Sequence, residues 1–291
     1  MKAPGAGLLR RRKRTEVVFR VLTTGSAVVV LLSLLLILGT ILWKSVPALS
    51  LSMLTQTPRG GFYLGKGGGI LNAIAGSLYL ALGATALALL LSLPLALYLN
   101  TYKGRASKTA VWTRFFLDVL WGVPSIVYGA FGFVVMLALG LRASLLAGMM
   151  TVALLEFPIM ARAIDEVMRL VPRELKDASA SLGATRFETA AKVMIRQAAP
   201  GILTGILLAF GRGIGDAASV LFTAGFTDRV PTSLADPAAT LPLAIFFQLG
   251  TPFPEVQQRA YASAAILTLI ILIISLAGRA MSRKVTRHVV K

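Results

Sequence analysis

The sequence from residue 21 to residue 42 contains no charged side chain. A helix needs about 20 consecutive apolar residues to cross the hydrocarbon core of a bilayer, and this run has that length. The apolar core of a cleaved signal peptide is about 7–15 residues long, which is shorter. We therefore predict a retained transmembrane helix at 21–43, preceded by a basic segment at 1–20.

The rest of the chain repeats this pattern. Hydrophobic residues make up 56% of the 291 residues and charged residues only 14%, which is too apolar for a soluble domain of this length. Further apolar runs cover approximately residues 75–99, 115–141, 143–161, 197–227 and 260–278. The sequence therefore predicts an all-α, polytopic membrane protein with six transmembrane helices, the last five of them within 70–281.

Basic residues are distributed unequally between the connections. The N-terminal segment, the connections near 103–114 and 162–196, and the C-terminal tail together hold 23 Lys and Arg residues, whereas the alternate connections hold six. Cytoplasmic loops of membrane proteins carry such an excess. We therefore expect both termini, including the tail at 282–291, in the cytoplasm and the loops at 44–69 and 227–259 outside it. Attraction to anionic membrane lipids then explains the net charge of +18, and no nucleic-acid partner is expected.

Several classes of chemistry have no residues to support them. The chain has no cysteine and a single histidine, His288, in its basic tail, so a metal site built from His and Cys is excluded. It has no Gly-x-x-x-x-Gly-Lys-Ser/Thr motif, so it is not itself a P-loop ATPase. An intramembrane enzyme with Asp118 and Glu156 as an aspartyl-type dyad is one alternative, although neither residue lies in a catalytic motif. We expect no enzymatic activity.

The segment at 171–200 is too charged for lipid, yet it is patterned as helix. Pro172 suits a first helical turn, and Gly183 can adopt the left-handed conformation that ends a helix. Thr185 and Glu188 have the spacing of a capping box, which starts a second helix at once. The sequence therefore predicts two short helices that meet at a bend, in a cytoplasmic loop between the fourth and fifth spans.

This loop resembles the EAA loop of ABC importer permeases, whose pattern is E-A-A, three residues, Gly, nine residues and Ile-x-Leu-Pro. The matching positions here are Asp177, Ala178, Ser179, Gly183, Val193, Ile195 and Arg196. Arg196 stands in place of the family's proline.

A short amphipathic helix presented by a loop can seat in a groove of another protein. Helical spacing predicts that one face of the first helix carries Leu175, Ala178, Ser179 and Leu182. The residues expected to couple to an ATPase are Leu175, Asp177, Ala178, Ser179, Leu182, Gly183, Thr185 and Glu188.

Other segments narrow the resemblance to the phosphate-specific transport permeases. They are Gly-Val-Pro-Ser-Ile-Val-Tyr-Gly at 122–129, the glycine-rich run with Asn72 and Ser77, Phe-Pro-Ile at 157–159 with Arg162, Leu-Phe-Thr-Ala at 221–224 and Leu-Pro-Leu-Ala-Ile-Phe at 241–246. The resemblance covers approximately residues 53–280. It implies the type I ABC importer permease fold and a subunit of an ATP-driven phosphate importer in a bacterial or archaeal cytoplasmic (inner) membrane.

The resemblance also implies partners. A second, PstC-like permease subunit would complete the translocation pathway, and a dimeric, PstB-like ATPase would bind ATP and Mg²⁺. A PstS-like phosphate-binding protein, periplasmic or lipid-anchored, would deliver the substrate. No cofactor is expected in this chain.

Four residues are predicted to line the substrate pathway. Arg212 and Asp216 lie four residues apart in an apolar run, so on a helix they share one face. Arginine binds phosphate oxygens through a planar fork and stays charged, and the pair would be a salt bridge for which a passing anion competes. The resemblance assigns Arg212 and Arg162 to the phosphate pathway. Pro124 and Ser125 either open the backbone of the third span towards the pathway or form a simple proline kink.

The residues themselves leave several alternatives open. Another oxyanion, such as molybdate or sulfate, is an alternative cargo. Arg162 also fits an ordinary snorkelling or positive-inside residue near the end of the fourth span. Asp118 and Glu156 are expected to serve helix packing or an inter-subunit pair. A sensory or scaffold role beside transport is a further alternative.

Overall fold

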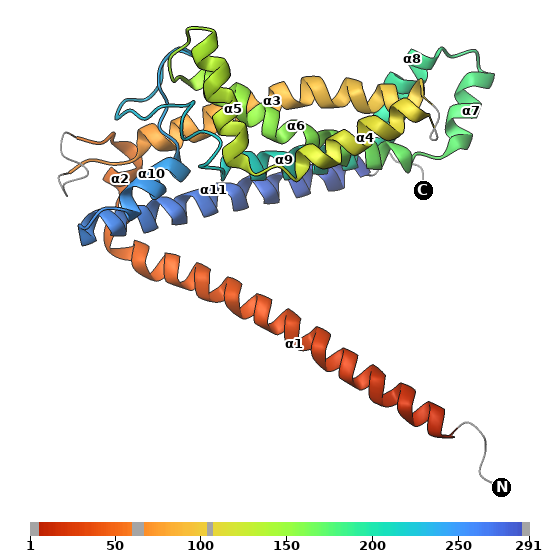
Figure 1. Cartoon of the computed structure of the whole chain (residues 1–291), viewed down its shortest axis with the longest axis horizontal. Coiled ribbons are helices and arrows are strands. Elements are labelled where there is room, and N and C mark those ends of the chain that lie inside the picture. The colour runs from red at the N-terminus through yellow and green to blue at the C-terminus, as the bar shows by residue number, and fades with distance from the viewer. Residues whose placement is uncertain (1–5, 60–66, 104–106, 287–291) are drawn as a thin grey trace.

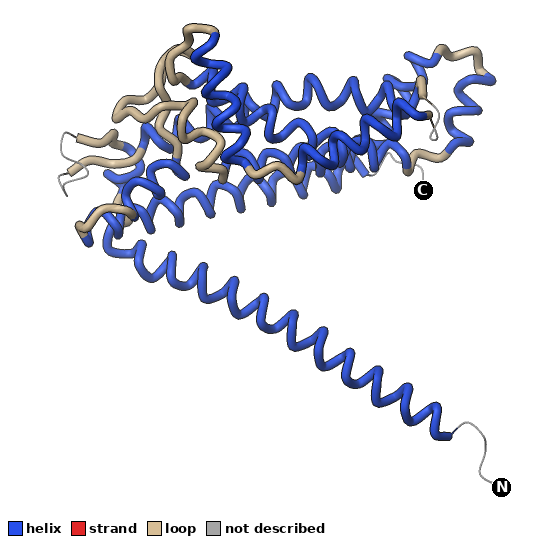
Figure 2. The backbone as a smooth tube through the Cα atoms, viewed as in Figure 1, coloured by secondary structure: helices blue, strands red, loops and turns tan. Residues whose placement is uncertain are grey.

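The computed structural model describes residues 6–59, 67–103 and 107–286. Within these ranges the chain is built of helices and loops, and the only strand-like pairing is an isolated bridge between Pro58 and Gly68 (Figure 2). The outer parts of the predicted basic termini, the middle of the first loop and His288 lie outside the described residues. The predicted all-α fold is confirmed for the part of the chain that is described.

The helices follow one another along the chain, and the longest connections among them join α2 to α3 and α9 to α10 (Figure 1). Their bounds are α1 Ala6–Ser45, α2 Leu51–Thr55, α3 Leu71–Thr101, α4 Lys108–Trp121, α5 Ser125–Ala138, α6 Leu145–Arg169, α7 Arg173–Ser181, α8 Arg186–Glu188, α9 Ile195–Ile214, α10 Leu241–Leu249 and α11 Pro254–Thr286, with a 3₁₀ turn η1 at Val46–Ala48 and a π-helical turn η3 at Thr189–Met194. Among the described residues, five helical stretches are long and apolar enough to cross a membrane, and α4 with α5 makes a sixth when the two count as one broken span.

The first helix stands apart from the rest of the molecule. None of the apolar window of α1 is buried, and the helix leaves the bundle at an angle (Figure 1). It is attached at its C-terminal end, where Lys44 Nζ lies 3.4 Å from the hydroxyl of Tyr261 and 4.9 Å from the centre of its ring. Both the start of α1 and the end of α11 lie at the end of the molecule that carries α7 and α8 (Figure 1).

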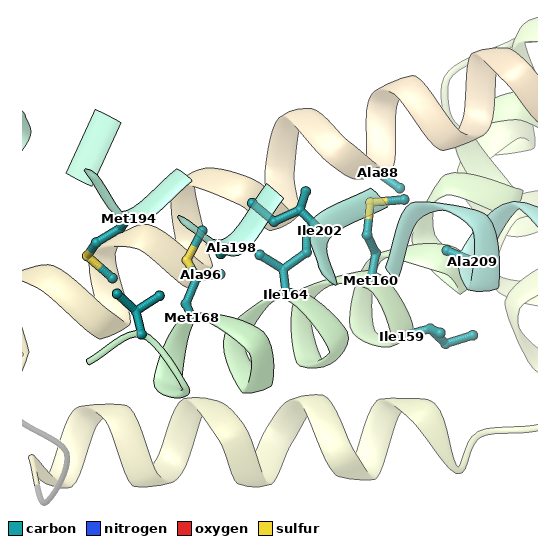
Figure 3. Packing of buried hydrophobic residues seen from close by; sticks show 11 residues of the cluster. Ala88, Ala96, Ile159, Met160, Ile164, Met168, Met194, Ala198, Ile202 and Ala209 are labelled. Carbon is teal, nitrogen blue, oxygen red and sulfur yellow. The ribbon is translucent and has the colours of Figure 1, made fainter. Parts of the chain in front are cut away.

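The core of the bundle lies where α3, α6 and α9 meet. Met160, Ile164 and Met168 of α6 are fully buried, and they pack against the small side chains of Ala88 and Ala96 on α3 and against α9 (Figure 3). Small residues let helices approach closely. In a membrane, where the surrounding lipid is itself apolar, helices associate through such close van der Waals packing and not through the hydrophobic effect. This packing fixes α6 as the central helix, from which the polar side chains described below project.

The third span, predicted at 115–141, is broken next to Pro124 and Ser125, where the sequence predicted either an opened backbone or a proline kink. The axes of α4 and α5 meet at 98°. Helix α4 ends at the cap residue Gly122, and α5 begins directly after Pro124. The helix cannot run unbroken through Pro124, because proline has no N–H with which to continue the hydrogen-bond pattern. The hydroxyl of Tyr128 donates a hydrogen bond of 2.8 Å to the carbonyl of Leu120 and so provides a partner for a carbonyl in the last turn of α4. Lys108 also lies within α4 rather than in a loop.

The fifth span ends earlier than predicted. Helix α9 stops at Ile214, with Gly215 as its C-terminal cap, instead of continuing to residue 227. The chain from 216 to 240 then folds back over the bundle without regular structure, and its backbone is held by groups far away in sequence. The Asn72 side-chain amide, for example, donates a hydrogen bond of 2.6 Å to the carbonyl of Thr227. Ala239, which the sequence placed in an extracytoplasmic loop, is fully buried.

Candidate functional site

The first predicted pair is formed. Arg212 Nη1 lies 3.1 Å from Asp216 Oδ1. Asp216 lies beyond the end of α9, so the two residues meet across the helix terminus and not, as predicted, one turn apart on a continuous helix. The other carboxylate oxygen of Asp216 accepts the backbone N–H of Ser219 at 2.8 Å. Asp216 is therefore held on one oxygen by Arg212 of α9 and on the other by Ser219 of the connection that follows α9.

The two members of this pair differ in access to solvent. The side chain of Asp216 is 5% exposed, whereas that of Arg212 is 48% exposed. A charge-assisted hydrogen bond fixes one end of the guanidinium, and an arginine carries further N–H donors in the same plane. The arrangement presents a half-exposed, oriented cation whose counter-charge is buried behind it. Such a group can bind an oxyanion without first breaking its own anchor.

Glu156 of α6 lies next to this pair. Its side chain is fully buried, and neither carboxylate oxygen has a hydrogen-bond partner among the described residues. The neighbouring polar group is the hydroxyl of Thr85 on α3, which likewise has no described partner. The carboxylate fills the space beside Gly213, the residue after Arg212. Asp118 pairs with Arg162, and neither oxygen of Glu156 is hydrogen-bonded to a described residue, so the two carboxyl groups share no hydrogen bond and do not make a dyad.

A second charged cluster surrounds Arg162. Its Nε lies 2.6 Å from Asp118 Oδ1 on α4, and its Nη1 lies 3.2 Å from Asp165 Oδ2. Asp165 in turn receives two hydrogen bonds from Arg114 of α4, at 2.7 and 2.9 Å, and one of 2.7 Å from the Asn100 side chain of α3. Two arginines and two aspartates therefore form a neutral network that joins three helices, which is how buried charges in a membrane are tolerated.

Sequence reasoning missed Asp165, Arg114 and Asn100. It ended the fourth span at residue 161, so it placed Asp165 in a cytoplasmic loop. The helix in fact continues to Arg169. Their sequence did contain one indication: Arg162 and Asp165 are three residues apart, so they lie on one helical face if the helix continues beyond Ala161. The expected helix-packing role of Asp118 is met by an ion pair within the chain, from α4 to α6.

The predicted pathway residues lie at two different levels along the helix bundle. Arg162 lies towards the C-terminal end of α6, which leads into α7, whereas Arg212 lies at the C-terminal end of α9, away from α7. Ser125 is the first residue of α5 and is half-buried at the break between α4 and α5. One turn later, Gly129 packs against the backbone of Ser219, whose N–H binds Asp216. The start of α5 is thus placed beside the connection that carries the Arg212 counter-charge.

The predicted bend at Gly183 is confirmed. Gly183 has a φ of +80°, and the N–H groups of Gly183 and Ala184 bind the carbonyls of Ala180 and Ser179, the pattern of a Schellman motif. The capping box is also formed. Thr185 Oγ1 accepts the N–H of Glu188 at 3.2 Å, and the Glu188 carboxylate accepts the N–H of Thr185 at 3.0 Å. We name the segment 171–188 the knob.

The second helix of the knob is not short. From Arg186 the helix continues through the π-helical turn η3 into α9 and ends only at Ile214. The prediction of two short helices is therefore wrong on this point. The physical reason is that Thr185 and Glu188 start a helix and nothing follows to stop it, since Pro200 lies inside α9. The knob is consequently the direct N-terminal extension of the fifth span.

Two side-chain contacts fasten the knob to the bundle. Lys176 Nζ lies 3.4 Å from the Asn100 carbonyl at the end of α3, and Ser179 Oγ lies 3.0 Å from Thr189 Oγ1 in η3. Leu182 by contrast is 89% exposed, and Phe187 is exposed as well. The predicted single face is therefore divided, because Ser179 is half-buried towards the bundle while Leu182 points away from it.

The exposed side of the knob combines features suited to a docking contact. Large apolar side chains exposed at the end of a membrane bundle are typical of an interaction surface. The remaining predicted coupling residues also belong to the knob. Leu175 is half-buried, and Asp177 and Ala178 are exposed. A rigid body of this kind can pass a displacement at its surface directly to α9.

Comparison with known proteins gives a consistent result. Residues 88–290 match the family model described as "Binding-protein-dependent transport system inner membrane component". Among curated proteins, the chain is 35% identical over 275 residues to the phosphate transport system permease protein PstA of Yersinia pestis, covering 94% of this chain and 92% of that protein. It is also 35% identical over 284 residues to PstA 1 of Mycobacterium tuberculosis (strain ATCC 25618 / H37Rv), covering 96% and 91%.

Solved structures share the fold. An inward-facing MetNI methionine ABC transporter aligns with a TM-score of 0.61 at 17% identity, covering 75% of this chain and 96% of that chain. A bacterial alginate ABC transporter in complex with a periplasmic protein aligns with a TM-score of 0.60 at 15% identity, covering 94% and 99%. The fold is that of the type I ABC importer permeases, and the chain is a multi-pass protein that belongs to the family of binding-protein-dependent transport system inner membrane components.

Proposed function

We propose that this chain is the transmembrane permease subunit of an ATP-driven importer of inorganic phosphate. It forms half of the translocation pathway, and a second permease of similar fold supplies the other half. The full-length relatives reported above are phosphate transport permeases, which supports phosphate as the cargo. The observation that carries the proposal is the Arg212–Asp216 pair, in which a half-exposed guanidinium sits on a buried carboxylate at the end of a membrane-length helix.

This geometry suits phosphate for a physical reason. Phosphate is a compact oxyanion with several acceptor oxygens, and an arginine fork can bind two of them at once. The counter-charge of Asp216 stabilises the cation inside the membrane when no anion is present, because an unpaired charge there is costly. Arg162 lies at the other depth of the bundle and provides a second cation along the pathway. Ser125, at the break of the third span, is proposed as a further polar contact.

Energy enters through the knob. We assign the coupling role to an ATPase dimer that binds ATP and Mg²⁺, docks on Leu182 and the neighbouring exposed residues, and moves α9 when it closes. This chain holds no cofactor and catalyses no reaction itself. The excess of Lys and Arg at the knob end of the molecule supports a cytoplasmic position for the knob and for both termini. A phosphate-binding protein, periplasmic or lipid-anchored, delivers the substrate at the opposite end.

The proposal is tested with the whole complex in proteoliposomes. Arg212→Gln is expected to abolish uptake of labelled phosphate while the complex still assembles. Arg20→Gln is the matched control, because it removes the same charge from an exposed residue of α1 that pairs only locally with Glu16. Normal uptake by Arg212→Gln would remove Arg212 from the pathway. Uptake that molybdate or sulfate suppresses more strongly than unlabelled phosphate does would show that the cargo is a different oxyanion.

A further inference from the structure

Arg162 has two carboxylate partners whose surroundings differ. Its Nε binds Asp118 at 2.6 Å, and its Nη1 binds Asp165 at 3.2 Å. The side chain of Asp165 is fully buried, whereas that of Asp118 is 51% exposed. A half-exposed carboxylate can separate from an arginine and be hydrated, but a fully buried carboxylate has no water to replace the arginine. The shorter of the two contacts is therefore also the one that can open.

Asp165 is held by more than Arg162. Arg114 binds both of its carboxylate oxygens, in the bidentate geometry that makes such pairs strong. Asn100 donates a further hydrogen bond of 2.7 Å, and the same amide also binds the carbonyl of Ala96. Three helices thus fix Asp165 in place. The Nη1 end of the Arg162 guanidinium is anchored, and the Nε edge faces the exchangeable partner.

We propose that Asp118 is a displaceable anion on Arg162. Its carboxylate occupies the guanidinium while the pathway is empty, and the transported oxyanion takes its place during passage. Asp165, with Arg114 and Asn100 behind it, is a positioning residue that keeps Arg162 in the same orientation throughout. This inference rests on the proposed transport of an oxyanion, and it names the group with which that anion competes.

The exchange keeps Arg162 paired. When the oxyanion arrives, one charge-assisted hydrogen bond to Arg162 replaces another, so the arginine is never left alone in the membrane. Asp118 lies in the last turn of α4, where its own carbonyl accepts the N–H of Gly122 at 3.3 Å. After displacement its negative charge stays close to the bound anion and repels it. Asp118 therefore weakens binding and speeds release, which a transporter needs for turnover.

The test compares amide substitutions in the complete complex reconstituted in proteoliposomes with labelled inorganic phosphate. Asp118→Asn is expected to lower the KM for phosphate by about tenfold, which corresponds to the loss of one competing interaction. Its maximal rate should fall because release becomes slower. Asp165→Asn is expected to raise the KM, since Arg162 loses its anchor. Glu166→Gln is the matched control, because Glu166 follows Asp165 on α6 and pairs with Arg169 at the surface.

The opposite signs of the two KM changes distinguish exchange from a merely structural role. An Asp118→Asn complex with the KM of Glu166→Gln, or with a raised KM, would overturn the proposal. Failure of Asp118→Asn to assemble, when Glu166→Gln assembles, would also overturn it, because Asp118 would then be structural. If the unaltered complex takes up no phosphate, the proposed function fails first; if it does and only the Asp118→Asn result is wrong, this inference alone fails.

Discussion

The carboxylate of Glu156 on α6 occupies the space that a Cβ atom at Gly213 of α9 would need. The contact joins the central helix to the residue that follows Arg212. It also explains why a residue without a side chain stands at position 213. The orientation of Arg212 consequently depends on how closely α6 and α9 approach one another.

Gly213→Ala is expected to push α6 and α9 apart and to reduce transport. Overpacking of this kind costs about 1–3 kcal/mol. Gly211→Ala is the control, because a Cβ at Gly211 would have no atom within 4 Å. The thermal unfolding temperature and phosphate uptake of the two purified complexes provide the measurement. The double variant Gly213→Ala with Glu156→Ala should recover part of the lost stability; no recovery would show that Glu156 is not the group that is displaced.

The bend of the knob depends on the positive φ of Gly183. No atom lies within 4 Å of a Cβ built there, so backbone conformation and not space limits substitution. Gly183→Ala is expected to lose about 1 kcal/mol of local stability, whereas Gly183→Asn should lose less, because asparagine tolerates the left-handed region. Gly183→Asp should uncouple ATP hydrolysis from uptake by placing a charge on the docking surface. Measured ratios of phosphate transported to ATP hydrolysed that equal the wild-type value in all three variants would contradict the coupling role.

Leu182 is the most exposed large hydrophobic side chain of the knob. Leu182→Glu is expected to weaken the association of the ATPase by about tenfold or more, since a charge would be buried without a partner in the contact. The fold of the permease should be unchanged, because the Leu182 side chain is 89% exposed. Co-purification of the ATPase and its affinity for the detergent-solubilised permease test the expectation. Glu174→Gln, an exposed polar change on the same helix, should leave the affinity unaltered.

The connection that follows α9 contains a carboxylate that is sensitive to pH. The backbone N–H groups of Thr232 and Ser233 and the Thr232 hydroxyl bind Asp236, and these bonds lower the pKa of its carboxyl group below the usual value. A lowered pKa means that the ionised form stabilises the folded loop. This contribution is present above the ordinary Asp pKa of about 3.9 and is lost as the pH falls through the folded-state value.

Asp236→Asn should therefore lower the unfolding temperature at neutral pH, and the difference from wild type should vanish in acid. Unfolding curves of the two proteins between about pH 3 and 7 measure this. A difference that stays constant down to the lowest pH would show that the ionised carboxylate is not what stabilises the loop.

The sequence predicted the features that depend on local chemistry. The uncharged runs predicted an all-α fold, because a segment inside a bilayer has few ways other than a helix to satisfy its backbone hydrogen bonds. Gly183, Thr185 and Glu188 predicted the bend and the capping box, since these motifs involve residues at most five positions apart. The Arg212–Asp216 pair was predicted for a similar reason, although the helix ends between its two members.

Tertiary structure alone decided the rest. Pro124 indicated a break in the third span, but no local signal gave the angle of 98° between α4 and α5, the place of Asp165 inside the bundle, or the continuation of α8 into α9. The network around Arg162 joins Asn100, Arg114 and Asp118 to α6, and those residues are separated from it by 44 to 65 positions in the chain. Helix packing brings them together because buried charges in a membrane must find partners wherever the fold supplies them. The sequence by itself identified Arg212, Asp216, Asp118 and Glu156 as charges within apolar runs. The tertiary structure added Arg114 and Asp165 to them and decided which of these charges neutralise one another.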